Sequence, residues 1–182
     1  MIQDLNQFPP IPALVPKPDF SIHADTPAVC LDGMWHLLQT PEPERFAVTP
    51  GTDGYTPVPV PSWNDPLHQP GFCGAYIYKT TVPVTPEMAA SRVVLRMEGV
   101  NGFAAVYING IKAAEHKNSF LTWNAEITAL IRGCDSFELS VTVDEREEKV
   151  SSFGHGGLLH SVWLYLLPSS FFRAVHTTTT FD

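Results

Sequence analysis

Hydrophobic and polar residues alternate over several short stretches of this chain. Val93, Leu95 and Met97 fall at every second position, and the same spacing recurs between Phe137 and Val143. A period of two is typical of β-strands that bury one face and expose the other. The pattern therefore predicts a strand at each stretch, and at the second one it predicts a buried face and a solvent-facing face.

The segment Ser91–Gly110 is predicted to be a central antiparallel meander. Gly99-Val100-Asn101-Gly102 supplies turn residues after the first strand, and a second alternating run follows from Ala104 to Ile108. Asn109-Gly110 then separates two strand-like runs. Because a type I′ turn needs positive φ at both central residues, Asn-Gly at this place predicts a two-residue hairpin.

Prolines and glycines divide the rest of the chain. Residues 1–27 hold six prolines, which predict an extended, irregular lead-in to one domain over residues 28–182. Residues 38–57 are rich in loop-forming residues. Prolines in 58–65 place that segment at a sheet edge or a strand exit, and Thr85-Pro86-Glu87 predicts a single helical turn capped by the threonine.

The segment Val162–Leu167 is apolar on both faces, since Trp163 and Tyr165 alternate with aliphatic residues. A strand of this kind is covered on both sides. In a two-layer sandwich its second face lacks a cover, so we expect an exposed patch around the two aromatic rings that mediates contact with another domain or self-association. Residues 171–180 are again predicted to be a strand.

Composition narrows the class of protein. Short alternating strands separated by turn residues predict an all-β sandwich, and 182 residues suit one domain with a real core. A net charge of −8 argues against nucleic acid and anionic membranes as partners. No apolar run is long enough to span a bilayer, and the first residues show no signal peptide, which favours a cytoplasmic over a secreted location.

The sequence contains no recognisable metal or nucleophile motif. Cys30, Cys73 and Cys134 are widely spaced without a CxxC pair, which predicts free buried thiols rather than disulfides or a zinc site. The seven histidines form no HExxH pattern, and no GxSxG or phosphate-binding loop is present. We therefore predict no catalytic residue, metal or cofactor.

Segments spread from Leu31 to Pro168 resemble a known family in their order along the chain. The resemblance is to the N-terminal sugar-binding domain of glycoside hydrolase family 2, which includes β-galactosidases, β-glucuronidases and β-mannosidases. The matching segments are LDGMWHL (31–37), VPVPSWND (58–65), AYIYKTTVP (75–83), RVVLRMEGV with AVYING (92–110) and GGLLHSVWLYLLP (156–168). The resemblance implies a jelly-roll sandwich of the galactose-binding type.

The resemblance also implies which chemistry this chain lacks. Enzymes of the family are retaining glycosidases whose two catalytic carboxylates lie on a (β/α)₈ barrel, after an immunoglobulin-like domain. A chain of 182 residues is too short for either domain, so we expect a non-catalytic, sugar-binding part of such an enzyme, truncated before both.

In the family, two loops of this domain reach the catalytic pocket and touch the terminal sugar of a β-glycoside. By position these loops are 62–74 and 150–156. Polar side chains there can bond sugar hydroxyls, and aromatic rings can stack on the sugar. The candidate sugar-binding residues are Trp63, Asn64, Asp65, His68, Ser151, Ser152, Phe153 and His155. The alternative is a structural loop with an Asx turn at Asn64 or Asp65.

Two departures from the family bear on this expectation. The family often carries an aspartate near the position of Ser151 and an arginine at the position of His160, and both charges are absent here. Their absence weakens the case for β-galactosidase-like or β-glucuronidase-like recognition, and His160 is predicted to be a packed or surface histidine.

The expected partners are a carbohydrate, the remaining domains of the same polypeptide and a second copy of the chain. A free-standing carbohydrate-binding module and a structural interaction domain remain alternatives.

Overall fold

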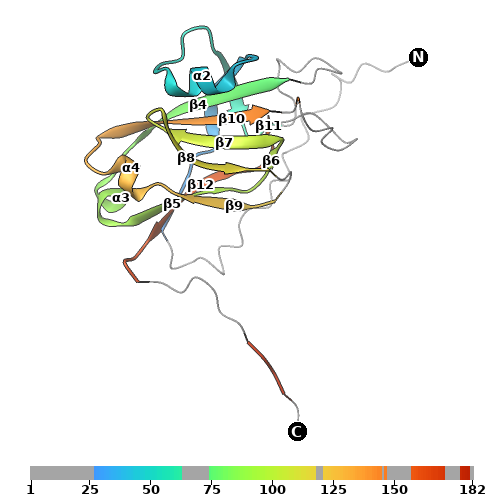
Figure 1. The fold of residues 1–182 in the computed structure, drawn as a ribbon. Helices are drawn as coiled ribbons and strands as arrows, with labels where there is room; N and C mark the ends of the chain where they lie inside the picture. Colours follow the sequence, from blue (N-terminus) through green and yellow to red (C-terminus); the bar gives the residue numbers. More distant parts are fainter. Residues whose placement is uncertain are drawn as a thin grey trace, which may run out of the picture.

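Two antiparallel sheets face each other in a β-sandwich of the jelly-roll type (Figure 1). This computed structural model describes residues 27–62, 74–117, 121–144, 146, 157–170 and 177–180. The four-stranded sheet has the order β1 (Ala28–Cys30), β12 (Val162–Leu167), β5 (Arg92–Met97) and β9 (Trp123–Glu126). The six-stranded sheet has the order β3 (Thr56–Val60), β2 (Gly33–Gln39), β4 (Ala75–Pro83), β10 (Ser136–Asp144), β7 (Phe103–Ile108) and β8 (Ile111–His116). A two-stranded pair joins β6 (Val100–Asn101) to β11 (Gly157–Leu158).

The alternating hydrophobic residues of both sheets form one core between them. Val93, Leu95 and Met97 of β5 are buried, as the sequence predicted, and they face the buried aliphatic side of β10. Trp35 of β2 lies in the same core, and its indole N–H donates to the carbonyl of Leu31 at 2.8 Å. The main hydrophobic driving force therefore comes from the two inner faces.

The predicted central meander is only half correct. β7 and β8 do form a hairpin, and Asn109 (φ 49°) and Gly110 (φ 78°) take the positive φ values that a type I′ turn requires. However, β5 belongs to the four-stranded sheet and β7 to the six-stranded sheet. The Gly-rich segment 99–102 crosses from one layer to the other instead of turning within a sheet, a distinction that local alternation does not encode.

Other local predictions are confirmed. β3 forms the outer edge of its sheet, where its prolines disturb no second neighbour. The helical turn is α3 (Pro86–Ala90), and the Thr85 hydroxyl accepts a hydrogen bond from the backbone N–H of Met88. A second short helix, α4 (Thr128–Ile131), lies near α3 at the same end of the sandwich (Figure 1).

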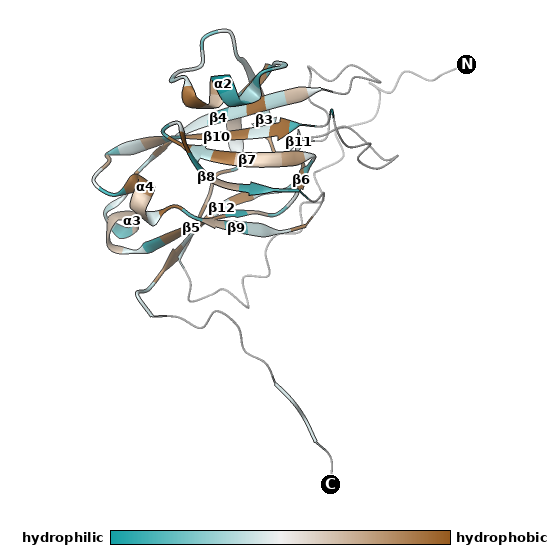
Figure 2. Cartoon of the chain, viewed as in Figure 1, coloured by the Kyte–Doolittle hydropathy of each residue, from teal (hydrophilic) through white to brown (hydrophobic). Residues whose placement is uncertain are grey.

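A helix covers the outer face of the six-stranded sheet, and the sequence did not predict it. α2 (Pro43–Val48) lies within 38–57, which was expected to be loop, and carries both apolar and polar residues (Figure 2). Its Ala47 packs with Ile77, Ala105 and Tyr107 in a second hydrophobic cluster outside the sandwich core. The outward face of β10 was predicted to meet solvent, but its Ser140 and Thr142 are buried.

A buried lysine lies on this covered face. Lys79 of β4 is fully buried, and its ammonium donates to the carbonyl of Thr49 (2.5 Å), the carbonyl of Gly51 (3.3 Å) and Glu138 Oε1 (2.8 Å). Glu138 also accepts from the backbone N–H of Gly51 through Oε2 (3.0 Å). All three donors of the ammonium are satisfied, so Lys79 and Glu138 fasten the segment after α2 onto the sheet.

Two expectations about exposure and one about a strand are wrong. Trp163 and Tyr165 are 8% exposed, so they form no open apolar patch, and the Arg96 guanidinium lies 5.8 Å from the centre of the Tyr165 ring. Cys30 and Cys134 are free, but Cys30 is exposed rather than buried, while Cys73 lies outside the described residues. Residues 177–180 are exposed without regular structure instead of forming a strand, and 171–176 are not described.

Candidate functional site

Both loops that the sequence singled out start and finish at one end of the sandwich. Before the first loop, the backbone N–H of Ser62 donates to the carbonyl of Leu158 at 3.1 Å. After the second loop, Gly157 pairs with Asn101, and Leu158 pairs with Val100. The start of one loop and the finish of the other are therefore held against the same short pair of strands, β6 and β11, opposite α3 and α4 (Figure 1).

The remaining two ends of the loops meet on β4 and β10. Ala75, just after the first loop, pairs with Asp144, the last residue of the strand that leads toward the second loop, and Asp144 also pairs with Phe103 on β7. Gly102 packs closely against the end of β10. A Cβ on it would lie 2.8 Å from Val143 Cγ1 and 3.2 Å from the Asp144 carbonyl oxygen, so glycine is the residue that fits here. We call Ser62, Gly74, Asp144 and Gly157 the loop stems.

The candidate sugar-binding residues themselves lie outside the described residues. This holds for all of Trp63, Asn64, Asp65, His68, Ser151, Ser152, Phe153 and His155. Their roles stay predictions. The structure brings together the four stems from which those residues extend, and sequence spacing alone could not show this. His160 is half-buried, and its ring packs against Gly99, consistent with a packed histidine.

An ion pair stands at the stem of the second loop. Arg146 donates to Asp144 Oδ1 through its backbone N–H and its Nε, both at 2.9 Å, and its Nη1 donates to the Pro41 carbonyl at 2.7 Å. These side-chain hydrogen bonds lower the pKa of the Asp144 carboxyl, against the opposing effect of burial. Arg146 thus ties the start of this loop both to β10 and to the segment before α2.

Aromatic and basic side chains contact one another on β7, at the end of β8 and on β9. The Lys117 ammonium lies 5.3 Å from the centre of the Phe103 ring, and His116 stacks on Trp123 with ring centroids 5.2 Å apart and planes 3° from parallel. Trp123 is buried, and its indole N–H has no hydrogen-bond partner. The pattern along the chain gave no signal for these contacts, because they depend on β7, β8 and β9 being neighbours.

Within the part of the chain that the structure describes, no three histidine, cysteine or acidic side chains gather as a metal site would require. The same residues include no helix long and apolar enough to cross a bilayer.

A family model described as "glycosyl hydrolase 2 galactose-binding domain-like" matches residues 58–158, which is more than half of the chain. The chain belongs to this family. The matched region contains both predicted loops and all four stems. The family resemblance found in the sequence is thereby confirmed, and with it the galactose-binding-like sandwich.

Curated relatives of this family 2 domain include a β-galactosidase, a β-glucuronidase and a β-mannosidase. The chain is 31% identical over 109 residues to a β-galactosidase of Thermoanaerobacter pseudethanolicus and 24% identical over 120 residues to a β-glucuronidase of Rattus norvegicus. It is 27% identical over 125 residues to β-mannosidase B of Thermothelomyces thermophilus. These matches cover 50–63% of this chain but only 14–18% of the relatives.

Solved structures show the same fold. The β-glucuronidase of Ruminococcus gnavus aligns with a TM-score of 0.67 at 22% identity, covering 79% of this chain and 29% of that one. A β-glucuronidase of an uncultured Clostridium species gives a TM-score of 0.68 at the same identity and coverage. The family 2 domain thus matches a minor part of each larger chain.

Proposed function

We propose that this chain is a non-catalytic sugar-binding domain that contacts the terminal sugar of a β-glycoside through loops 62–74 and 150–156. The observation that carries the proposal is the convergence of both loops on one end of the sandwich, through the pairings Asn101↔Gly157 and Ala75↔Asp144. Two loops with adjacent stems can present polar and aromatic side chains to one ligand, and a monosaccharide needs both kinds of contact.

We further propose that the domain serves a longer retaining β-glycosidase, in which other domains of the same polypeptide supply the two catalytic carboxylates. The named relatives support this, because each is a glycosidase several times longer than the region it shares with this chain. In that setting the role of this domain is to bind and orient the sugar. The 182-residue chain alone is then expected to hydrolyse no chromogenic β-glycoside.

Titration of the purified chain with the methyl β-glycosides of galactose, glucuronic acid and mannose, followed by NMR, tests the sugar-binding role. We expect one of the three to shift amide signals of the two loops. Trp63→Ala and His68→Ala should abolish these shifts, because they remove a stacking face and a hydrogen-bonding ring. Asp53→Ala is the matched control, since Asp53 lies in the exposed segment after α2.

Three results would each contradict a different part of the proposal. Binding that survives all the loop substitutions would contradict the placement of the site, and the absence of binding by any of the three sugars would contradict the sugar-binding role. Turnover of a chromogenic glycoside by the pure chain, retained after repeated purification, would contradict the non-catalytic role.

A free-standing carbohydrate-binding module is the second candidate. The burial of Trp163 and Tyr165 favours it, because an exposed apolar patch would have been the mark of a missing neighbouring domain. The length of the natural reading frame decides between the two candidates. Roughly 250 or more further residues would provide a barrel, whereas a short frame would support the free module.

A further inference from the structure

The outer face of the four-stranded sheet is buried along β12. Val162, Leu164 and Leu166 of this strand belong to the sandwich core, so Trp163 and Tyr165, which alternate with them, lie on the opposite face. Each of these two residues is 8% exposed. A strand that is buried on both faces has a cover on each of them, and the six-stranded sheet covers only the inner face.

None of the described helices covers this outer face. α2 lies over the other sheet, and α3 and α4 lie at one end of the sandwich (Figure 1). Neither Trp163 nor Tyr165 belongs to the two hydrophobic clusters that the described residues form. Because both rings are shielded within a single chain, their cover is another part of the same polypeptide.

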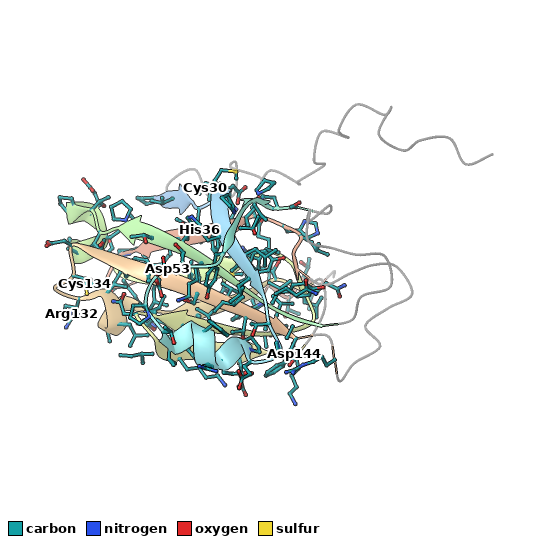
Figure 3. All side chains as sticks on the ribbon, turned by 90° about the horizontal axis from the view of Figure 1, so that it is seen from above. Cys30, His36, Asp53, Arg132, Cys134 and Asp144 are labelled. Atoms are coloured by element: carbon teal, nitrogen blue, oxygen red, sulfur yellow. The ribbon has the colours of Figure 1, made fainter. Side chains whose placement is uncertain are left out.

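The covered part of the face is a narrow strip. The outward residues of β12 and β5 are buried or half-buried, namely Trp163, Tyr165, Val94 and Arg96. The outward residues of the flanking strands are exposed, namely Ala28 and Cys30 on β1 and Asn124 and Glu126 on β9. Figure 3 shows Cys30 at the rim of the described fold. Two neighbouring strands span about 10 Å, a width that suits one extended segment and not a folded domain.

The N-terminal segment ends beside this strip. The N–H of Leu166 donates to the carbonyl of Pro27 at 2.8 Å, and Ala28 then pairs with Tyr165. Residues 1–26 lie outside the described part of the chain. Twenty-six residues span roughly 80 Å in a polyproline conformation, whereas Tyr165 and Trp163 lie only about 7 Å apart along their strand. Length and attachment therefore both allow this segment to cross the two rings.

The composition of residues 1–26 suits an aromatic face. The segment holds five prolines together with Phe8 and Phe20. Proline has no N–H that would lose its partner on burial, and proline-rich segments dock on aromatic side chains in an extended form that costs little entropy. We propose that residues 1–26 form a strap that lies across Trp163 and Tyr165. The strap gives the four-stranded sheet an outer cover, as α2 does for the six-stranded sheet.

Two other segments near β12 in the sequence fit the strip less well. Residues 171–176 number only six and lie between 168–170 and 177–180, which are exposed, and 177–180 lie away from the sandwich in Figure 1. The loop 150–156 ends at Gly157, which pairs with β6 and not with a strand of the four-stranded sheet.

Nuclear Overhauser contacts in the unmodified 182-residue chain test the inference directly. We expect the ring protons of Trp163 and Tyr165 to show contacts with proline and phenylalanine side chains of residues 1–26. Contacts of the rings with 147–156 or 171–176 in place of the strap would overturn the inference. Contacts with a second copy, seen in a sample that mixes labelled and unlabelled chains, would overturn it too, as would the absence of contacts with 1–26.

A matched pair of tyrosine substitutions in the full chain tests the strap by proteolysis. Chymotrypsin cleaves after phenylalanine, and Phe20 lies within the strap. Tyr165→Ser removes half of the aromatic surface, so we expect cleavage after Phe20 to become roughly tenfold faster as the open form becomes more populated. Tyr107→Ser is the control, because Tyr107 is 6% exposed and lies in the cluster beneath α2 on the other sheet.

The control separates release of the strap from general loss of stability. Equal acceleration in both variants would mean that unfolding of the whole domain exposes Phe20, and would overturn the inference. Cleavage of Tyr165→Ser at the rate of the unmodified chain would overturn it as well. If Tyr165→Ser does not fold, the contacts measured in the unmodified chain decide alone.

Discussion

At the scale of single residues, Lys79 is a fully buried cation whose ammonium has three hydrogen-bond partners. It is a charged group with no exposed surface, and it persists because two carbonyls and the Glu138 carboxylate take its three donors. Glu138 keeps 21% of its side-chain surface exposed, so part of its charge is hydrated. Loss of Lys79 would thus leave two carbonyls without a donor but would not leave a fully buried anion.

Lys79→Met should lower the free energy of unfolding by about 2–3 kcal/mol, slightly below the usual cost of breaking a buried pair. Chemical denaturation measures this change. Lys112→Met is the control, because Lys112 pairs with Glu115 at the surface and such pairs contribute roughly 0–1 kcal/mol. Equal effects of the two substitutions would show that the Lys79 contacts do not hold the segment after α2.

The ion pair between Asp144 and Arg146 should make the free energy of unfolding depend on pH. Since hydrogen bonds from Arg146 lower the pKa of Asp144 in the folded state, the pair stabilises the fold above the unfolded pKa of about 3.9. That contribution is lost as the pH falls below this value and through the folded pKa. Arg146→Gln should therefore reduce stability at pH 7.

Denaturation of both proteins between pH 2 and 7 measures the difference. We expect the gap between the wild-type chain and Arg146→Gln to narrow as the pH falls from about 4 through the lowered folded pKa of Asp144, because the carboxyl is protonated in both the folded and the unfolded state only below that pKa. A gap that stays constant across this range would mean that Arg146 acts through the Pro41 carbonyl alone.

At the scale of elements, the β7–β8 hairpin links three parts of the fold. Asn109 accepts from the N–H of Glu138 through Oδ1 and donates its own N–H to the Glu138 carbonyl, both at 2.9 Å. Gly110 lies against α2, because a Cβ on it would come within 3.2 Å of the Val48 carbonyl oxygen. The turn therefore meets both β10 and the helix that covers the sheet.

Gly110→Ala should destabilise the chain more than Gly133→Ala. Both glycines have φ 78°, so both substitutions add the strain of a left-handed alanine, about 1–2 kcal/mol. Only Gly110 has a neighbour within 4 Å, so the difference between the variants measures the cost of the contact with α2. Thermal unfolding gives both values, and equal losses would show that the helix shifts without cost.

At the scale of the whole molecule, Trp163 and Tyr165 are buried on the face of β12 opposite Val162, Leu164 and Leu166, which belong to the sandwich core. Each is 8% exposed on β12, which lies between β1 and β5 in the four-stranded sheet. Their burial removes the reason to expect self-association through this face.

Trp163→Ser should destabilise the chain by about 3 kcal/mol, as expected for the truncation of a large buried ring, and should leave its oligomeric state unchanged. Denaturation and light scattering measure the two effects. A reduced apparent mass together with unchanged stability would instead assign Trp163 to a contact between copies of the chain.

The sequence by itself determined most of the local structure. Alternation located β5, β7 and β10, Asn109-Gly110 specified its turn, and Thr85-Pro86 specified the start of α3. These features depend on neighbouring residues, whose φ preferences and hydrophobic period are written directly in the chain. The order of several short segments was also enough to indicate the family.

The tertiary structure alone decided which surfaces are covered. The alternation in β5 and β7 is the same whether the strands share a sheet or face each other, so the crossover at 99–102 was not predictable. Ser140 and Thr142 look solvent-facing until α2 packs over them, and Lys79 looks exposed until Thr49 and Gly51 approach it. The meeting of the loop stems depends likewise on pairings between residues far apart in the chain, which no local pattern specifies.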